Sequence, residues 1–153
     1  MNARFLGLSA VLLAGLLAAC NGNAVPITFA SRVIDTNTIE QGRQLYGQYC
    51  AACHGVDGQG QFPDAPLVPD STGRYGAPPH DDGGHTWHHG DALLLQIVRE
   101  GGMGDPKDFY PMPPFSTQLS DDQIISIIAY LKTMWTDDHR ANQQRRTEAE
   151  AEA

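Results

Sequence analysis

The segment Cys50-Ala51-Ala52-Cys53-His54 decides how this 153-residue sequence is interpreted. Apolar residues recur at spacings of three and four from Thr38 up to the segment, and this period predicts a helix that runs straight into it. Any of the residues 36–38 could cap that helix. Two thiols and one imidazole therefore lie within about one turn of backbone.

The spacing Cys-x-x-Cys-His is typical of covalent attachment of a c-type haem. Cys50 and Cys53 can form thioether bonds to the two vinyl groups of the macrocycle, and His54 then lies beneath the iron as its proximal ligand. A thioredoxin-like dithiol would instead place its first cysteine at the start of a helix in a strand-helix-strand unit. A structural zinc site would need two further ligands. We therefore predict one covalent haem c.

The iron of an electron carrier needs a sixth ligand, and Met112 is the leading candidate. Prolines on both sides of Met112 stiffen the loop 110–115, which suits a thioether held over the iron. Met103 is the backup, but the glycines around it fix it less well, and Met134 belongs to a helical pattern. A histidine ligand or an open position is the alternative to methionine.

The first nineteen residues have the features of an export signal. Arg4 supplies the positive start, and the apolar run 5–17 is shorter than the roughly 20 residues that a membrane-spanning helix needs. Leu17-Ala18-Ala19-Cys20 resembles the lipobox of bacterial lipoproteins, in which the cysteine is lipidated after cleavage; ordinary cleavage beside an incidental Cys20 is the alternative. We predict a lipoprotein signal peptide at 1–19 and a lipid on Cys20. The lipid would hold the domain on a bacterial membrane, facing the periplasm or the cell exterior.

Cysteine count and net charge restrict the remaining classes of function. Three cysteines are an odd number for an exported protein, but lipid on Cys20 and haem on Cys50 and Cys53 give each a separate role and leave no disulfide. The formal net charge of -8 argues against nucleic acid as a partner. We expect an acidic monomer whose redox partner proteins, such as membrane oxidoreductase complexes, present a basic surface.

The rest of the pattern indicates an all-α fold of about three to five helices with long loops. Asp91–Glu100 is amphipathic, and a stronger apolar stripe begins behind the capping box Ser120–Gln123 and ends near Trp135. Glycine and proline interrupt residues 55–90 throughout. A loop of that length fits a compact domain when it is functional or wraps a cofactor.

The sequence resembles a class I, mitochondrial-type bacterial monohaem cytochrome c over about residues 38 to 135. The matching pieces stand in the family's order: a helix with Gly42 and Tyr46, Cys50 to Gly55, the Gly58-x-Gly60 turn, Pro66-Leu67, the helix end Arg99-Glu100-Gly101, Met112-Pro113-x-Phe115, and a final helix with Tyr130-Leu131. This resemblance implies a small cytochrome c fold wrapped around one covalent haem. The expected parts are a tether at 20–36, the cytochrome c domain at 37–136, and a polar C-terminal tail, frayed or helical and without core contacts, at 137–153.

The resemblance also implies two contacts within the domain. The first and last helices would cross where Gly42 and Tyr46 meet the region 127–131. A proline carbonyl, here that of Pro66, would accept the ring proton of His54 and so orient the imidazole. The long polar tail and a histidine-rich segment depart from the family pattern.

That segment contains His80, His85, His88 and His89. The four side chains could bind copper or zinc, but a solvated loop over the haem edge is the simpler interpretation, and we expect no second metal. Trp87 in the same segment could donate its indole proton to a haem propionate.

The function that these expectations favour is single-electron transfer by a membrane-tethered carrier, without enzymatic activity. Iron with His54 and Met112 as ligands can change oxidation state while both ligands stay bound. A haem enzyme, such as a peroxidase or a small-molecule reductase, would need an open distal position with an acid-base group near it. A haem sensor module would also need an open or different sixth position, so the ligand at Met112 separates the carrier from both alternatives.

Overall fold

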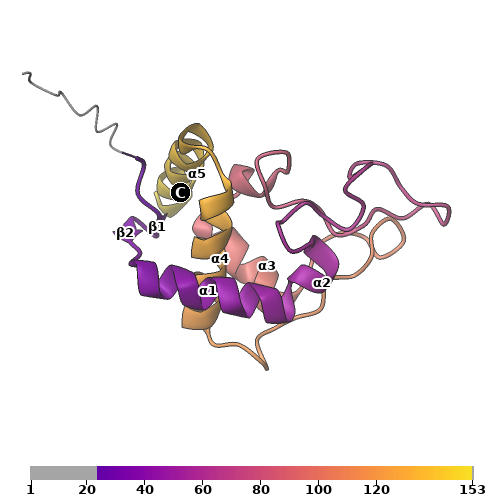
Figure 1. Ribbon diagram of the computed structural model, residues 1–153, viewed down its shortest axis with the longest axis horizontal. Coiled ribbons are helices and arrows are strands. Elements are labelled where there is room, and N and C mark those ends of the chain that lie inside the picture. The colour runs from indigo at the N-terminus through magenta and orange to yellow at the C-terminus, as the bar shows by residue number, and fades with distance from the viewer. Residues whose placement is uncertain (1–23, 153) are drawn as a thin grey trace, which may run out of the picture.

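The structure, a computed structural model, describes residues 24–152. The expected signal peptide and the lipidation site Cys20 lie outside the described residues. In chain order the elements are β1 (Thr28–Phe29), β2 (Arg32–Val33), α1 (Thr36–Tyr49), α2 (Ala51–His54), η1 (Thr86–His88), α3 (Asp91–Glu100), α4 (Asp121–Leu131), η2 (Lys132–Met134) and α5 (Asp137–Ala151) (Figure 1). The predicted all-α fold with long loops is confirmed. Between residues 24 and 152, no helix combines the length and the apolar composition that crossing a membrane requires.

The crossing of α1 and α4 forms the centre of the fold (Figure 1). The carboxylate of Asp35 caps α1 by accepting hydrogen bonds from the amides of Asn37 and Thr38, so the cap stands just before the residues that the sequence suggested. At the crossing, a Cβ atom on Gly42 would lie 1.8 Å from the carbonyl oxygen of Ser126. Glycine is therefore required for the two backbones to approach this closely.

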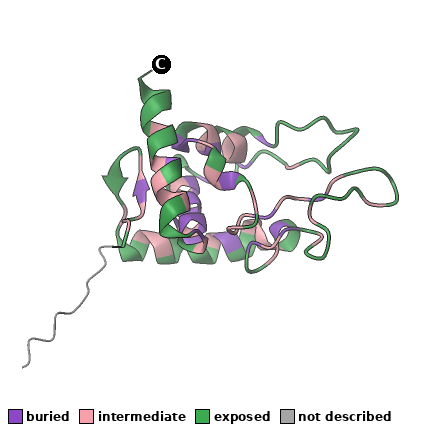
Figure 2. Ribbon diagram, turned by 90° about the horizontal axis from the view of Figure 1, so that it is seen from above, coloured by how far each residue is buried: buried purple, intermediate pink, exposed green. Residues whose placement is uncertain are grey.

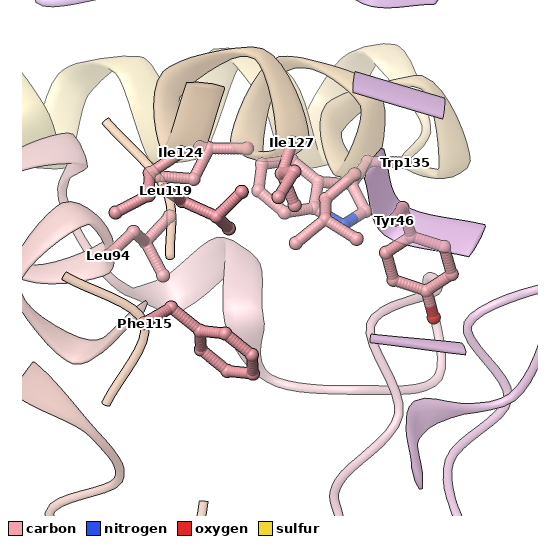
Figure 3. Packing of buried hydrophobic residues seen from close by; sticks show 9 residues of the cluster. Tyr46, Leu94, Phe115, Leu119, Ile124, Ile127 and Trp135 are labelled. Carbon is pink, nitrogen blue, oxygen red and sulfur yellow. The ribbon is translucent and has the colours of Figure 1, made fainter. Parts of the chain in front are cut away.

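Tyr46 lies one turn beyond this crossing and is 1% exposed. Its ring centroid is 5.4 Å from that of Tyr130 on α4. Its hydroxyl points away from the apolar cluster (Figure 3) and donates to the carbonyl of Gly55 at 2.7 Å. The expected contact between the first helix and the region 127–131 is confirmed. Through its hydroxyl, Tyr46 also connects α1 to the turn that follows His54.

Helix α4 supplies most of the core. Ser120 and Gln123 form the predicted capping box at its start, with each side chain bonded to the other residue's amide. Behind the box, Ile124, Ile127 and Ile128 are at most 1% exposed. Burying a side chain of this size contributes about 1.5–3 kcal/mol. Further members of the cluster are Tyr46, Leu94, Phe115, Leu119, Leu131 and Trp135 (Figure 3).

Two long loops, residues 55–85 and 101–120, extend beyond the helices (Figure 1). Most of their residues are exposed or half-buried (Figure 2). The loops meet where Tyr75 and Phe109 pair and stack their rings at 5.2 Å. Several large apolar side chains on them stay exposed: Leu67, Val68, Met103, Phe109 and Tyr110. The loops thus have apolar surface that the helices do not cover.

The N-terminal segment is more ordered than the expected tether. β1 and β2 form an antiparallel hairpin, and Thr28 is buried. The Thr28 carbonyl accepts from Lys132 at 2.6 Å, and the Ala30 amide donates to the Asp91 carboxylate at 2.8 Å. Residues 28–36 therefore belong to the folded body, which corrects the assignment of all of 20–36 to a tether.

The C-terminal segment also differs from the expectation of a tail without core contacts. It forms the helix α5, one of the two forms expected, but Gln143 on this helix is 1% exposed and therefore packed against the body. The amide of Gln143 donates to the Asp91 carboxylate at 2.8 Å and lies 3.2 Å from the carbonyl of His89. The hydroxyl of Thr147 accepts from the Asp91 amide at 3.1 Å. α5 docks through polar groups, so its sequence shows no apolar stripe from which docking could be predicted.

Candidate cofactor site

The two thiols stand at the junction of α1 and α2. The amide of Cys50 donates to Tyr46 at 2.9 Å, and the amide of His54 donates back to the carbonyl of Cys50 at 2.9 Å. The amide of Cys53 also bonds to Cys50, at 3.1 Å. These bonds fix one turn of backbone on which Cys50, Cys53 and His54 follow one another, as their spacing predicted.

The state of the thiols argues against a redox-active dithiol. Both cysteines are free, Cys50 half-buried and Cys53 exposed. Burial raises the pKa of the Cys50 thiol to about 12, and neighbouring Cys53 acts in the same direction. A nucleophilic cysteine of the thioredoxin type has a lowered pKa, because its thiolate must form near neutral pH. The Cys50 thiol therefore lacks the activation that a redox-active dithiol of this type needs.

His54 is oriented by a hydrogen bond to a proline carbonyl, but the proline is Pro78. His54 is 6% exposed, and its Nδ1 lies 2.9 Å from the Pro78 carbonyl oxygen. Because a carbonyl only accepts, Nδ1 carries the proton and Nε2 keeps its lone pair for a metal. Burial lowers the pKa of His54, which favours the neutral ring that metal binding needs. The expected orienting residue, Pro66, lies in a turn elsewhere on the loop.

Backbone pairing within the loop explains why Pro78 takes this place. The Gly60 amide donates to the His54 carbonyl at 2.8 Å, and the Gln61 amide donates to Ala77 at 2.9 Å. The His80 amide donates to Gly58 at 2.6 Å. These bonds hold residues 77–80 alongside 58–61 and bring Pro78 to the imidazole. No local signal in the sequence separates Pro78 from Pro66, since the choice depends on this longer-range pairing.

His80 packs directly on the candidate proximal ligand. The rings of His80 and His54 are stacked, with centroids 4.1 Å apart and planes 24° apart. The Nδ1 atom of His80 is 2.8 Å from the Thr86 hydroxyl, and the indole of Trp135 donates to its carbonyl at 2.7 Å. Desolvation is the largest of the causes that lower the pKa of His80 well below its ordinary value. The neighbouring His54 and His85 lower this pKa further. His80 is therefore a neutral packing residue, a role that the sequence did not indicate.

The other histidines of the segment do not converge with His80. The rings of His85 and His89 meet edge to face at 5.4 Å, and His88 lies against Trp87 at 3.9 Å. Among residues 24–152, no group of three or more histidine, cysteine or acidic side chains is placed to hold a metal ion. The copper or zinc interpretation gains no geometric support.

Trp87 has a buried donor without an acceptor. Its indole nitrogen is buried and has no hydrogen-bond partner among the described residues, while the ring packs against the core. Leaving a buried donor unpaired costs roughly 1–3 kcal/mol. A haem propionate is an anionic acceptor of the kind that this nitrogen lacks, so the environment of Trp87 fits the expected contact.

Met112 is held by a glycine pair at the end of α3. The amide of Gly102 donates to the Met112 carbonyl at 3.0 Å, and a Cβ on Gly101 would lie 2.9 Å from the same oxygen. Met112 is half-buried against the core, whereas Met103 is 71% exposed. The sulfur of Met134 fills the space beside Gly58. Of the candidate thioether ligands in the loops, Met112 is the one with a fixed backbone.

Taken as a donor set, these residues fit a haem c. Two free thiols flank a single turn, and the adjacent imidazole has its Nε2 lone pair available. Exposed apolar loop side chains and an unpaired indole N–H are the further features that such a group would cover or satisfy.

Comparison with known proteins gives the same indication. Residues 39–135 match the protein-family model described as Cytochrome c. Two curated relatives are the cbb3-type cytochrome c oxidase subunits CcoP of Azospirillum brasilense, 30% identical over 108 residues, and of Azospirillum sp. (strain B510), 26% identical over 108 residues. Each alignment covers 71% of this chain and 32% of the relative, so the chain spans about a third of the length of these relatives.

Among solved structures, the chain resembles cytochrome cL from the marine methylotrophic bacterium Methylophaga aminisulfidivorans MPT. The TM-score is 0.51 at 20% identity, over 75% of this chain and 66% of that one. A likeness at this identity shows the fold alone.

Proposed function

This chain belongs to the cytochrome c family, and on that basis we propose that it carries single electrons outside the cytoplasm through one covalent haem with His54 and Met112 as axial ligands. Family membership implies a covalent haem c and a role in electron transport. The observation that carries the more specific proposal is the geometry of His54, whose Nδ1 is held by the Pro78 carbonyl while Nε2 is left for iron.

Each residue of the site has a distinct task in this proposal. Cys50 and Cys53 attach the macrocycle through thioethers, and His54 ligates the iron in an orientation set by Pro78. The bound haem supplies the ferrous–ferric couple. Met112 contributes a soft thioether that favours ferrous iron. Burial of the haem in an apolar pocket favours the same oxidation state, because ferrous iron carries the lower charge. Such a site has no need to bond a substrate.

The ligand assignment is tested by optical spectroscopy of the haem-loaded protein. The oxidised protein is expected to show the weak band near the infrared edge that sulfur-to-ferric-iron charge transfer produces. Met112→Ala abolishes this band, whereas the matched variant Met103→Ala retains it. Loss of the band in Met103→Ala alone would transfer the role to Met103. If the wild-type protein lacks the band and binds carbon monoxide rapidly when reduced, a haem enzyme or a sensor describes the chain better.

The anchoring part of the proposal rests on Leu17-Ala18-Ala19-Cys20. A lipid on Cys20 would keep the haem domain at a membrane surface facing the periplasm or the cell exterior. In cell fractionation, the wild-type protein is expected with the membranes and Cys20→Ser with the soluble periplasmic fraction, both carrying haem. Equal distribution of the two proteins would remove the anchor from the proposal and leave the electron carrier intact.

The partners that we propose are membrane oxidoreductase complexes. The curated relatives are named as subunits of cbb3-type cytochrome c oxidases, and the net charge of -8 favours a partner with a basic surface. Oxidation of the reduced protein by a solubilised oxidase complex should slow as salt is added, because added ions screen opposite charges. A rate independent of salt would contradict electrostatic recognition.

A further inference from the structure

We propose that His139 on the C-terminal helix is a positioning residue that holds the Trp87 indole in place toward a haem propionate. This inference rests on the proposed function, since it concerns the haem that Cys50 and Cys53 would attach. It assigns a role to α5, which lies beyond the residues 39–135 that match the family model.

The first observation is the stack between the two rings. The imidazole of His139 lies on the indole of Trp87 with centroids 3.7 Å apart and planes 10° apart. α5 contacts η1, the short helix that carries Trp87, so the stack lies within a wider docked interface. His139, which lies 52 positions after Trp87 in the sequence, therefore covers one face of the indole.

The second observation is that His139 is itself fixed. Its Nδ1 lies 2.7 Å from the carboxylate of Asp82, which also accepts the amide of Thr136 at 2.8 Å. The Thr136 hydroxyl caps α5 by accepting from the His139 amide. Asp82 thus ties the start of α5 to the loop that precedes Trp87, and it holds the imidazole of His139 at Nδ1.

The third observation is the unpaired donor. The indole nitrogen of Trp87 is buried without a partner in the described chain, although its ring is well packed between His139 and the core. A packed ring with an unsatisfied N–H is positioned for an acceptor that the polypeptide does not supply. A propionate of the bound haem has the required chemistry.

The expected consequence is a change in reduction potential when the stack is removed. A donated indole proton offsets part of the propionate charge, and without it the full negative charge stabilises ferric iron. His139→Ala should therefore lower the potential of the haem-loaded protein. His139→Phe, which keeps an aromatic ring on the indole, should restore most of the difference.

A double-mutant cycle separates positioning from general destabilisation. Trp87→Phe removes the indole donor and should lower the potential by itself, and adding His139→Ala to Trp87→Phe should then lower it no further. Additive shifts, or an unchanged potential in His139→Ala, would overturn the proposal. Circular dichroism of each variant checks that α5 stays helical, and His139→Phe covers the case in which the alanine variant undocks the helix.

The outcome is distinguishable from failure of the proposed function. The sulfur-to-iron band should persist in every variant of this series, because none touches His54 or Met112. If the band is present and the potentials do not respond to His139, the electron carrier stands and the positioning role of His139 falls. If the wild-type protein lacks the band and binds carbon monoxide rapidly when reduced, the proposed carrier itself fails.

Discussion

At the scale of single residues, the most demanding feature is the buried ion pair between Lys132 and Asp91. Lys132 and Asp91 are each 2% exposed, and their charged atoms are 2.5 Å apart. Burial lowers the pKa of Lys132, opposed by Asp91, which favours the charged amine. The pair also organises its neighbours, since Lys132 reaches the Thr28 carbonyl and Asp91 receives Gln143.

Breaking this pair should destabilise the protein strongly. Asp91→Asn keeps the size of the side chain but leaves the Lys132 charge buried without compensation, at a cost of roughly 3–5 kcal/mol. Denaturant unfolding of the haem-loaded variant measures this loss. The control is Glu40→Gln, which removes the exposed pair with Arg43 and should leave the unfolding midpoint unchanged. Equal midpoints for both variants would contradict a structural role for the buried pair.

The residues of the site differ in whether the local sequence pattern could predict them. Cys50, Cys53 and His54 could be predicted because their spacing is itself the chemical requirement. Pro78 could not, because its approach to His54 depends on pairing between residues 58–61 and 77–80. His139 gave no signal either, since a lone histidine on a polar helix has no pattern to distinguish it.

At the scale of elements, the close crossing of α1 and α4 makes the clearest prediction. Gly42→Ala would place a Cβ 1.8 Å from the Ser126 carbonyl oxygen, so the helices must separate. Forcing extra volume into such a contact typically costs about 1–3 kcal/mol. Gly47→Ala is the matched control on the same helix, because nothing lies within 4 Å of its added Cβ. Alanine there should stabilise the helix by up to about 1 kcal/mol.

Thermal unfolding of the haem-loaded variants measures both effects. Gly42→Ala should lower the unfolding temperature, and Gly47→Ala should raise it. A Gly42→Ala variant as stable as Gly47→Ala would show that the helices do not cross as closely as described.

The contact between the two long loops should depend on pH. Hydrogen bonds from Thr72 and from the Tyr110 hydroxyl lower the pKa of the Asp70 carboxyl below its ordinary value of 3.8. A carboxyl with a lowered pKa in the folded state stabilises that state above its unfolded pKa and loses this effect as pH falls through the lowered value. The stabilisation by the Tyr110 link should therefore be complete well above pH 3.8 and be lost as pH falls below this value toward the lowered pKa of Asp70.

This titration can be followed by the Asp70 carboxyl signal in nuclear magnetic resonance. Tyr110→Phe should move the Asp70 pKa upward, toward the ordinary value, without affecting the distant Asp35. An unchanged Asp70 titration in that variant would remove Tyr110 as the cause.

The elements also differ in how far their sequences revealed them. The capping box and the isoleucine stripe of α4 are local patterns, and the structure reproduces both. α5 carries no apolar stripe because Gln143 docks it through hydrogen bonds, and periodicity does not register polar docking. The β1–β2 hairpin is anchored by contacts with Asp91 and Lys132, which lie far along the chain.

At the scale of the whole molecule, the two ends of the described part of the chain, the hairpin and α5, converge on Asp91. The hairpin reaches Asp91 through Ala30, and α5 reaches the same carboxylate through Gln143. Both ends therefore contribute to the stability of a body whose family-matched part is 39–135. The folded body therefore extends on both sides of residues 39–135, the part that matches the family model.

Deleting residues 137–153 tests this statement. The truncated protein loses the hydrogen bond from Gln143 to the Asp91 carboxylate, and a bond to a charged group is worth about 1.5–3 kcal/mol. The free energy of unfolding of the haem-loaded protein should fall by at least this amount. Deleting only 148–153 retains Gln143 and Thr147 and should cost little, and equal losses for the two deletions would contradict the role of Gln143.

The ordered hairpin has a consequence for how the molecule meets other proteins. If Cys20 is lipidated, the link from the bilayer to Thr28 reaches at most about 29 Å, since an extended chain spans no more than about 3.6 Å per residue. The thiols lie at the far end of α1 from the hairpin (Figure 1). The protein would then diffuse in two dimensions along the membrane, with Thr28 within this reach of the lipid surface. Its encounter rate would depend on how densely partners populate the same membrane rather than on their concentration in solution.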